Sequence, residues 1–294
     1  MLKDAQERKY CVGYFESWDL ESTMAVVHAA EKLRSPVIIG YCGEYLENPE
    51  RAYREDLHLH GKMLRHIARS ASVPVATLLN ECSSAAYAMN GISARFDMVM
   101  FVDEEMPHDT FVAEQRKLVE FAHACGVAVE GELGTLPTAN KNSGTLHGGR
   151  YTDPDKAAHF VRETGVDVLS IAIGNTHLLE DGKAELDIDL LERIHNKVNI
   201  PLALHGGTGV EKAVFKEASR HGIAKVNVGA GLKRAAINAF RAYFQQMDVN
   251  SMNPNRILGD GGSSDFHRRA HDAVMKTVAE FIQAFGGENK ARIC

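Results

Sequence analysis

The sequence predicts an α/β fold, a (β/α)8 TIM barrel with an extra C-terminal helical arm. Eight short apolar runs recur along the chain, helix-length stretches separate them, and proline or glycine precedes several of the runs. A run of four or five apolar residues is typical of a strand buried on both faces, and regular alternation of such strands with helices is the barrel pattern. The predicted strands cover residues 11–15, 37–41, 75–79, 98–102, 127–129, 168–173, 202–204 and 225–228.

The segments between these runs carry helix signals. Met24, Val27 and Ala30 recur at helical spacing and place apolar side chains on one face of a predicted helix. Asp153 followed by Pro154 predicts the start of another helix. An aspartate accepts hydrogen bonds from the free amides of a first turn, and proline fits at the first helical position.

The length of 294 residues allows one barrel or two small domains, and no compositional break favours two. We therefore expect a single barrel domain over residues 1–294, with residues 235–294 as a C-terminal helical extension. Helices are expected at residues 235–247 and 266–285, around a glycine-rich hinge at residues 258–262. Such an arm often packs on another subunit, so we expect a homodimer or a homotetramer.

Composition narrows the class of partner. A formal net charge of −6 without a clustered basic face argues against nucleic acid and anionic membranes, which leaves small molecules. No apolar run approaches the roughly 20 residues of a membrane span, and the first residues lack the apolar core of a signal peptide, so a cytoplasmic location is expected. The five cysteines are widely spaced without a C-x-x-C pair, which predicts neither a disulfide framework nor a structural zinc site.

Polar residues follow the predicted strands, where barrel enzymes carry their chemistry. His177 and His205 end neighbouring strands and could offer imidazole nitrogens to one divalent metal ion. A single histidine on an apolar strand is more often a core residue, but two on adjacent strands beside glycines favour a metal site. The other polar residues at these strand ends are Glu16, Asn80, Glu81, Asp103, Glu104, Glu105, Glu132 and Asn227.

Glycine-rich turns after the last two strands predict a phosphate site. The backbone amides of Gly206, Gly207 and Thr208 would face those of a second turn, as in the phosphate cradles that barrels build from these loops. The alternative is that both are merely tight turns. A phosphorylated substrate is the favoured interpretation, and the second turn consists of Val228, Gly229 and Ala230.

The polar, glycine-rich segment 135–150 is too long for an ordinary connection. It is expected to be a mobile active-site loop. The alternative is a surface loop without a role.

With these residues placed, the chain resembles the class II, metal-dependent ketose-bisphosphate aldolases, the family of fructose- and tagatose-bisphosphate aldolases. The matching segments are SPVI (35–38), VPVA (73–76), VEGELG (129–134), YTDP (151–154), AIGNTH (172–177), LHGGTG (204–209) and KVNV (225–228). In this family a zinc ion on three histidines polarises the ketone of a phosphorylated sugar and stabilises an enediolate. The resemblance implies that His177 and His205 bind the metal and that Glu132 reaches it in an alternative position. It also implies that the two glycine-rich turns, with Asn227, hold the phosphate and the enediolate.

The chain departs from the family pattern after the third strand. The family has Asp-His-Gly there, with the histidine as third metal ligand and the aspartate in proton transfer, and this chain has Asn80, Glu81 and Cys82. Asn80 cannot exchange a proton at neutral pH, although it stays a candidate catalytic residue through hydrogen bonding. Glu81, His177 and His205 would form a two-histidine, one-carboxylate site. That ligand set suits manganese, iron or cobalt as well as zinc.

Other changes affect the proton-transfer groups. The family's Asp-Gly-Ser-His after the fourth strand is replaced by residues 102–105. Glu104 or Glu105 could supply the displaced proton transfer, since a carboxylate crowded by others titrates nearer neutrality, or they could form a solvated face. Residues 140–142 offer no clear counterpart of the family's loop glutamate, Glu16 replaces an asparagine, and Ala230 replaces a threonine.

Three functions follow from these matches and departures. The first is a metal-dependent carbon–carbon lyase of aldolase type acting on a phosphorylated ketose or related sugar derivative, with Asn227 on the enediolate. The second is a metal-dependent isomerase or epimerase on a sugar phosphate or sugar acid, which would fit the loss of the aldehyde-end residues. The third is a non-catalytic relative that binds a phosphorylated ligand, against which the retained His177, His205 and Asn227 argue.

Overall fold

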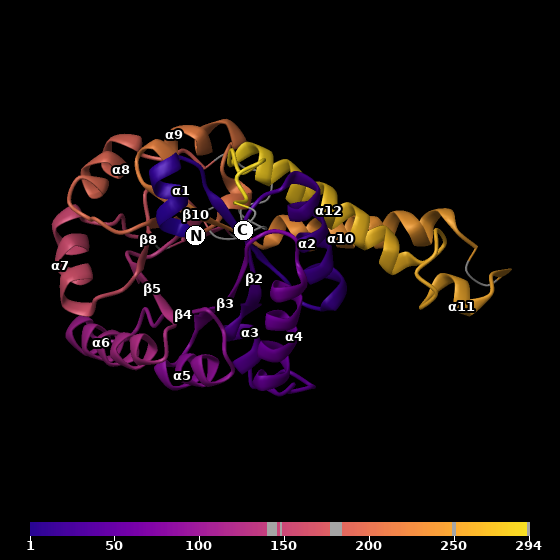
Figure 1. The fold of residues 1–294 in the computed structure, drawn as a ribbon, viewed down its shortest axis with the longest axis horizontal. Helices are drawn as coiled ribbons and strands as arrows, with labels where there is room; N and C mark the ends of the chain where they lie inside the picture. The colour runs from indigo at the N-terminus through magenta and orange to yellow at the C-terminus, as the bar shows by residue number, and fades with distance from the viewer. Residues whose placement is uncertain (140–145, 148, 177–183, 249–250, 293–294) are drawn as a thin grey trace.

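The computed structural model describes residues 1–139, 146–147, 149–176, 184–248 and 251–292. Eight parallel strands close into a barrel with helices around it, which confirms the predicted (β/α)8 fold (Figure 1). In order around the barrel the strands are β1 (Val12–Glu16), β10 (Ile223–Val228), β9 (Leu202–Leu204), β8 (Val168–Ile171), β5 (Ala128–Leu133), β4 (Met98–Phe101), β3 (Val75–Cys82) and β2 (Val37–Cys42).

Helices connect the strands, and one further helix precedes them. Ala5 on the first helix shares a buried cluster with residues of the barrel interior, so this helix covers the amino-terminal end of the barrel. The helices before the C-terminal arm are α1 (Leu2–Arg8), α2 (Leu20–Leu33), α3 (Gly43–Glu47), α4 (Leu57–Ser70), α5 (Ala85–Ser93), α6 (His108–Ala124), α7 (Pro154–Thr164), α8 (Ile188–His195) and α9 (Phe215–Arg220), with short 3-10 turns at Gly207–Gly209 and Lys212–Val214.

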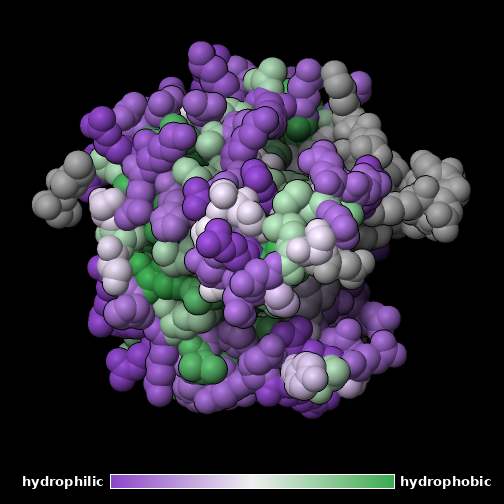
Figure 2. Space-filling view, turned by 90° about the vertical axis from the view of Figure 1, so that its right-hand side faces the viewer, coloured by the Kyte–Doolittle hydropathy of each residue, from purple (hydrophilic) through white to green (hydrophobic). Residues whose placement is uncertain are grey.

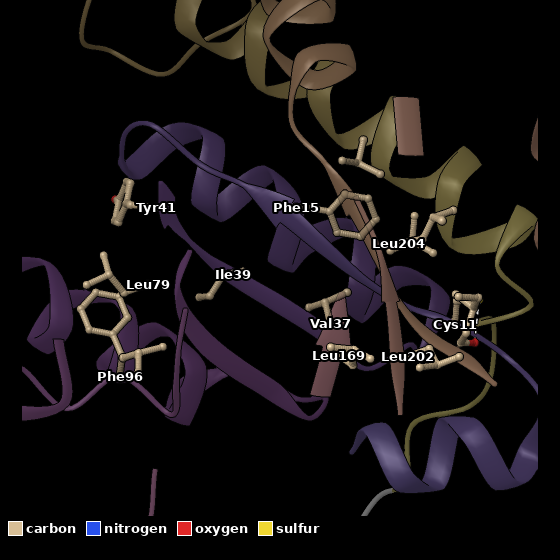
Figure 3. Packing of buried hydrophobic residues seen from close by; sticks show 14 of the residues in the cluster. Cys11, Phe15, Val37, Ile39, Tyr41, Leu79, Phe96, Leu169, Leu202 and Leu204 are labelled. Carbon is tan, nitrogen blue, oxygen red and sulfur yellow. Dashed lines mark hydrogen bonds between the residues drawn. The ribbon is translucent and has the colours of Figure 1, made fainter. Parts of the chain in front are cut away.

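Successive strand residues alternate between the barrel interior and the layer beneath the helices, as the period of two requires. Phe15, Val37 and Leu204 pack in the outer layer (Figure 3). Tyr14 and Ile38, their neighbours in sequence, belong to the separate interior cluster. The next interior-facing residues, nearer the carboxyl ends of the strands, therefore face the carboxyl-terminal mouth of the barrel.

Strands β3 and β5 extend further than predicted. Asn80, Glu81 and Glu132 lie within these strands, not in the connections that follow them. The register of β3 against β4 shifts between Leu79 and Cys82, and Glu81 adopts the left-handed φ of 48°. Such an irregularity re-aims a side chain. It lets the consecutive residues Asn80 and Glu81 both contact groups from the far side of the barrel mouth.

The predicted start of the helix after residue 152 is confirmed. The Asp153 side chain accepts hydrogen bonds from the amides of Asp155 and Lys156, and Pro154 is the first residue of α7. Upstream of it, β6 (Thr138–Ala139) pairs antiparallel with β7 (Leu146–His147). Residues 140–145 and 148 lie outside the described part of the chain, so the mobility expected of segment 135–150 stays a prediction.

The C-terminal arm consists of α10 (Ala230–Gln246), α11 (Pro254–Ile257) and α12 (Phe266–Ala284). It projects from one side of the barrel, with α11 at its far end (Figure 1). Helix α10 begins at Ala230, earlier than predicted, because it follows β10 directly. Seen from the far end of the arm, the surface is mainly hydrophilic with separate hydrophobic patches (Figure 2). Across the described chain, no helix is both long and apolar enough to span a membrane.

Candidate metal and substrate site

A cavity of about 260 Å³ at the carboxyl ends of the strands gathers most of the predicted site residues. Those that line it are Asn80, Glu81, His205, Gly206, Thr208, Asn227, Val228, Gly229 and Ala230. Gly207 is buried beside them, since a Cβ atom built on it would lie 2.8 Å from the Asn227 carbonyl oxygen. Tyr14, Glu16, Tyr45 and Thr176, together with Lys233, Arg234 and Ile237 of α10, complete the lining.

His205 is held between two carboxylates. Its Nδ1 lies 2.9 Å from Glu81 Oε1, its Nε2 lies 2.9 Å from Glu130 Oε1, and its side chain is 1% exposed. Burial alone would lower the pKa of His205, but the hydrogen bonds to Glu130 and Glu81 outweigh it and raise the pKa to about 9. The ring is therefore fixed in direction by protein groups on both sides.

Glu130 is paired with a second buried charge. Lys225 Nζ lies 2.8 Å from Glu130 Oε2, and both side chains are fully buried. The Lys225 ammonium also lies 5.1 Å from the centre of the Tyr14 ring. Burial raises the pKa of Glu130, but the attraction of Lys225 and the hydrogen bond from His205 prevail and hold it below its usual value. The Glu130 carboxylate, which faces Lys225, accepts a hydrogen bond from His205 Nε2–H. Nδ1 is then the ring nitrogen that faces Glu81.

Lys225 also orients Asn227. Its ammonium donates to Asn227 Oδ1. Because a lysine ammonium can only donate, this contact determines which end of the amide is the oxygen. Asn227 Nδ2 then donates to Asn80 Oδ1 at 3.5 Å, and both residues line the cavity. The amide is thus directed so that it can donate to an oxygen of a bound substrate.

Glu130 and Lys225 lie in the matched segments VEGELG and KVNV, but no role for them was predicted from the sequence. The available signal was a charged residue inside an apolar strand. Side chains of this kind are buried only when paired, which predicts a partner without identifying it.

Of the predicted metal ligands, Glu81, His205 and Glu132 come together. Glu132 Oε2 lies 3.7 Å from His205 Nδ1 and accepts a hydrogen bond from Ser170 at 3.0 Å. Burial raises the pKa of Glu132 to about 7. His177, the fourth predicted ligand, lies outside the described residues. Carboxylates and an imidazole converging in a buried place form a donor set that fits a divalent metal ion.

Most of the predicted phosphate cradle lines the same cavity as Glu81. Gly206 has the left-handed φ of 67°, and a Cβ there would be 2.4 Å from the Thr176 carbonyl oxygen, so only glycine fits this turn. Thr208 Oγ1 accepts from the amide of Gly231 at 3.1 Å, which ties this turn to the start of α10. The first turn of a helix of this length attracts anions through its free amides and its dipole.

Glu104 and Glu105 do not join the cavity of His205. Both are exposed in the connection after β4, and the Glu105 amide donates to Asp103 Oδ1 at 3.0 Å. Glu104 lines a separate cavity of about 220 Å³, which Glu132 and Arg150 also line. Asp103 lines that cavity as well, so carboxylates gather beside Glu104, and the proton-transfer role of Glu104 or Glu105 stays a prediction.

Known proteins are similar in sequence to this chain over nearly its whole length. Residues 1–290 match the model of the family described as fructose-bisphosphate aldolase class-II. The uncharacterized protein YdjI of Escherichia coli K12 is 31% identical over 288 residues, covering 98% of this chain and 96% of its own. A fructose-bisphosphate aldolase of Staphylococcus aureus is 32% identical over 294 residues, covering 99% and 97%.

The solved structures that resemble this chain also carry the name aldolase. The crystal structure of the YdjI aldolase from Escherichia coli K12 superposes with a TM-score of 0.78 at 29% identity, covering 99% of this chain and 97% of its own. A putative fructose-1,6-bisphosphate aldolase from Coccidioides immitis, with a TM-score of 0.78 at 24% identity and coverage of 98% and 96%, shows the shared fold alone. The chain therefore belongs to the class-II fructose-bisphosphate aldolase family and is a metal-dependent lyase of aldolase type.

Proposed function

We propose that the protein cleaves, and in reverse forms, a carbon–carbon bond of a phosphorylated ketose or a related sugar derivative. The observation that carries this proposal is the joint orientation of His205 and Asn227 by one buried ion pair at the barrel mouth. A metal-binding imidazole and an amide donor aimed into one cavity suit a reaction in which negative charge develops on neighbouring substrate oxygens.

Glu81 and His205 are proposed as metal ligands, with Glu132 as an alternative one. His177 is proposed as a further ligand on the resemblance alone. A divalent metal ion supplies an electrophile that polarises the ketone carbonyl. Zinc is our first choice, and manganese, iron and cobalt stay candidates because the carboxylate of Glu81 replaces a histidine.

The chain's own groups perform the remaining tasks. Asn227 Nδ2 donates to a substrate oxygen that becomes negatively charged, and the Glu130–Lys225 pair keeps the amide and the imidazole in place. The amides of Gly206, Gly207, Thr208 and the 228–230 turn are proposed to bind the phosphate. Glu104 or Glu105 could transfer a proton only if the connection after β4 carried the carboxylate toward this cavity.

An isomerase or epimerase is the second candidate, and one observation favours it. Asn80 is buried beside Asn227 at the place where the family has a proton-exchanging aspartate. Without that aspartate, a group in the cavity could still remove a proton from the carbon next to the ketone and return it. No aldehyde would then be released.

The test is an assay of the purified protein against a panel of ketose phosphates, before and after removal of metal with a chelator. We expect cleavage that is lost with the metal and restored by zinc, manganese, iron or cobalt. Detection of dihydroxyacetone phosphate or another three-carbon product identifies cleavage, whereas a product of unchanged mass identifies isomerisation or epimerisation. Protein that binds no transition metal even on soaking would refute both catalytic functions.

We also propose that the protein is a homodimer or a homotetramer that associates through the arm. Ile237 and Phe244 on α10 and Leu258 after α11 are large apolar side chains exposed in the single chain. Apolar area of this kind favours association when a partner covers it. Light scattering of the purified protein should give two or four times the mass of 32.3 kDa, and a monomer mass would contradict the proposal.

A further inference from the structure

We propose that Glu16, Cys42 and Glu81 bind a divalent metal ion through two carboxylate oxygens and the cysteine sulfur, on the β1–β2–β3 side of the cavity. This position differs from the one that the family resemblance implies, because it uses a thiolate and no histidine. The inference rests on the proposed metal dependence of the protein and adds a second ion position beside the one proposed at Glu81 and His205.

The three residues come from three successive strands. Glu16 ends β1, Cys42 ends β2, and Glu81 lies in the irregular end of β3. One potential ligand atom from each lies within 4.8 Å of the other two. Since parallel strands end at the same edge of the barrel, the fold itself maintains this convergence.

The separation of sulfur and oxygen already fits a common ion. The Cys42 thiol donates a hydrogen bond to Glu81 Oε2, with the sulfur 3.6 Å from the oxygen. In a tetrahedral zinc site with bonds of about 2.3 Å to sulfur and about 2.0 Å to oxygen, these two ligand atoms are about 3.5 Å apart. An ion that replaces the thiol proton would therefore find this pair of ligand atoms at a suitable separation.

The two oxygens of Glu81 face different neighbours. Oε1 lies 2.9 Å from His205 Nδ1, and Oε2 lies on the side of Cys42. An ion on the Oε2 side thus leaves the contact with His205 in place.

The Tyr14 hydroxyl is an independent observation that points to a ligand. Tyr14 is 1% exposed, its hydroxyl has no hydrogen-bond partner among the described residues, and the side chain lines the same cavity as Glu16 and Glu81. A buried hydroxyl without an acceptor is unfavourable, and an oxygen ligand completing the coordination of the ion would accept from it.

Glu16 also pairs with Lys233 of α10, so a bound ion would share this carboxylate with the lysine. Binding of the ion releases the Cys42 proton to solvent and leaves a thiolate on the metal. One soft sulfur with two hard oxygens selects zinc, cobalt, iron or cadmium over magnesium and calcium.

The test is a titration of the metal-free protein with Co²⁺, followed by absorbance in the near ultraviolet, where a thiolate bound to cobalt gives a charge-transfer band. We expect the band in the unaltered protein and its loss in Cys42→Ser. Cys82→Ser is the matched control, because Cys82 is equally buried but packs in the outer layer, and it should keep the band. Glu16→Gln should weaken Co²⁺ binding about tenfold or more.

A second measurement protects the test against misfolding of Cys42→Ser. In the unaltered protein, saturating Zn²⁺ should slow alkylation of Cys42 at least tenfold while leaving that of the exposed Cys125 unchanged. Cobalt bound without a thiolate band, or alkylation of Cys42 unaffected by Zn²⁺, would overturn this inference and leave the metal-dependent lyase standing. Failure to bind any cobalt would count against the proposed function as well.

Discussion

Lys225→Met is expected to lower the free energy of unfolding by about 3–5 kcal/mol, because it removes the ammonium that is paired with the fully buried carboxylate of Glu130. The pair lies wholly inside the barrel, where water cannot replace the lost partner. Equilibrium unfolding in urea measures the effect, provided that the transition is two-state.

Two further variants separate the pair from general damage to the core. The double variant Lys225→Met with Glu130→Gln should recover most of the loss, since glutamine carries no charge and still offers an oxygen to His205 Nε2. Lys212→Met removes a lysine from an ion pair of similar length, 2.7 Å, whose side chains are 45% and 47% exposed. It should change stability by less than about 1 kcal/mol. Equal losses in Lys225→Met and the double variant would show that packing, not charge, explains the effect.

The desolvation cost of burying this ion pair has a structural reason. An apolar pair of similar volume would often be as stable as buried ions or more so. The lysine and glutamate instead direct His205 and Asn227, which line the same cavity. Stability inside the barrel and orientation at its mouth therefore depend on the same two side chains.

The fold followed from local patterns of sequence. Runs such as 37–41 and 202–204 contain apolar residues for both faces of a strand, and the structure places Val37 and Leu204 outside and Ile38 and Ala203 inside the barrel. Asp153 and Pro154 marked a helix start because capping depends on residues a few positions apart. Each of these features is determined within one turn or one strand.

The site was less predictable because its contacts join distant parts of the chain. His205 meets Glu130 across 75 positions, and Lys225 meets the same carboxylate across 95. The left-handed backbone at Glu81 gave no sequence signal, since a glutamate there lacks the glycine that usually marks such a turn. Glu104 and Glu105 were chosen for their acidity, but acidity does not indicate whether a side chain turns into the mouth or toward solvent.

Asn227→Ala is expected to reduce kcat about 10²- to 10³-fold on the substrate identified in the ketose phosphate assay, the loss usual for a donor to a developing oxyanion. Lys225 Nζ donates a hydrogen bond to Asn227 Oδ1, so the amide nitrogen is the end of the side chain that remains to donate to the substrate. Metal content should stay unchanged, because Asn227 is not among the proposed ligands, and metal analysis of the same preparation verifies this.

Asn227→Asp is the matched variant, since it keeps the size of the side chain and the contact with Lys225 but removes the donor. If donation is the function of Asn227, aspartate fails as severely as alanine, because a carboxylate beside Lys225 has no proton to give. If Asn227 only fills space, aspartate restores most of the rate. A loss below about threefold in Asn227→Ala would contradict the donor role and return the stabilisation of negative charge to the metal ion and the backbone amides alone.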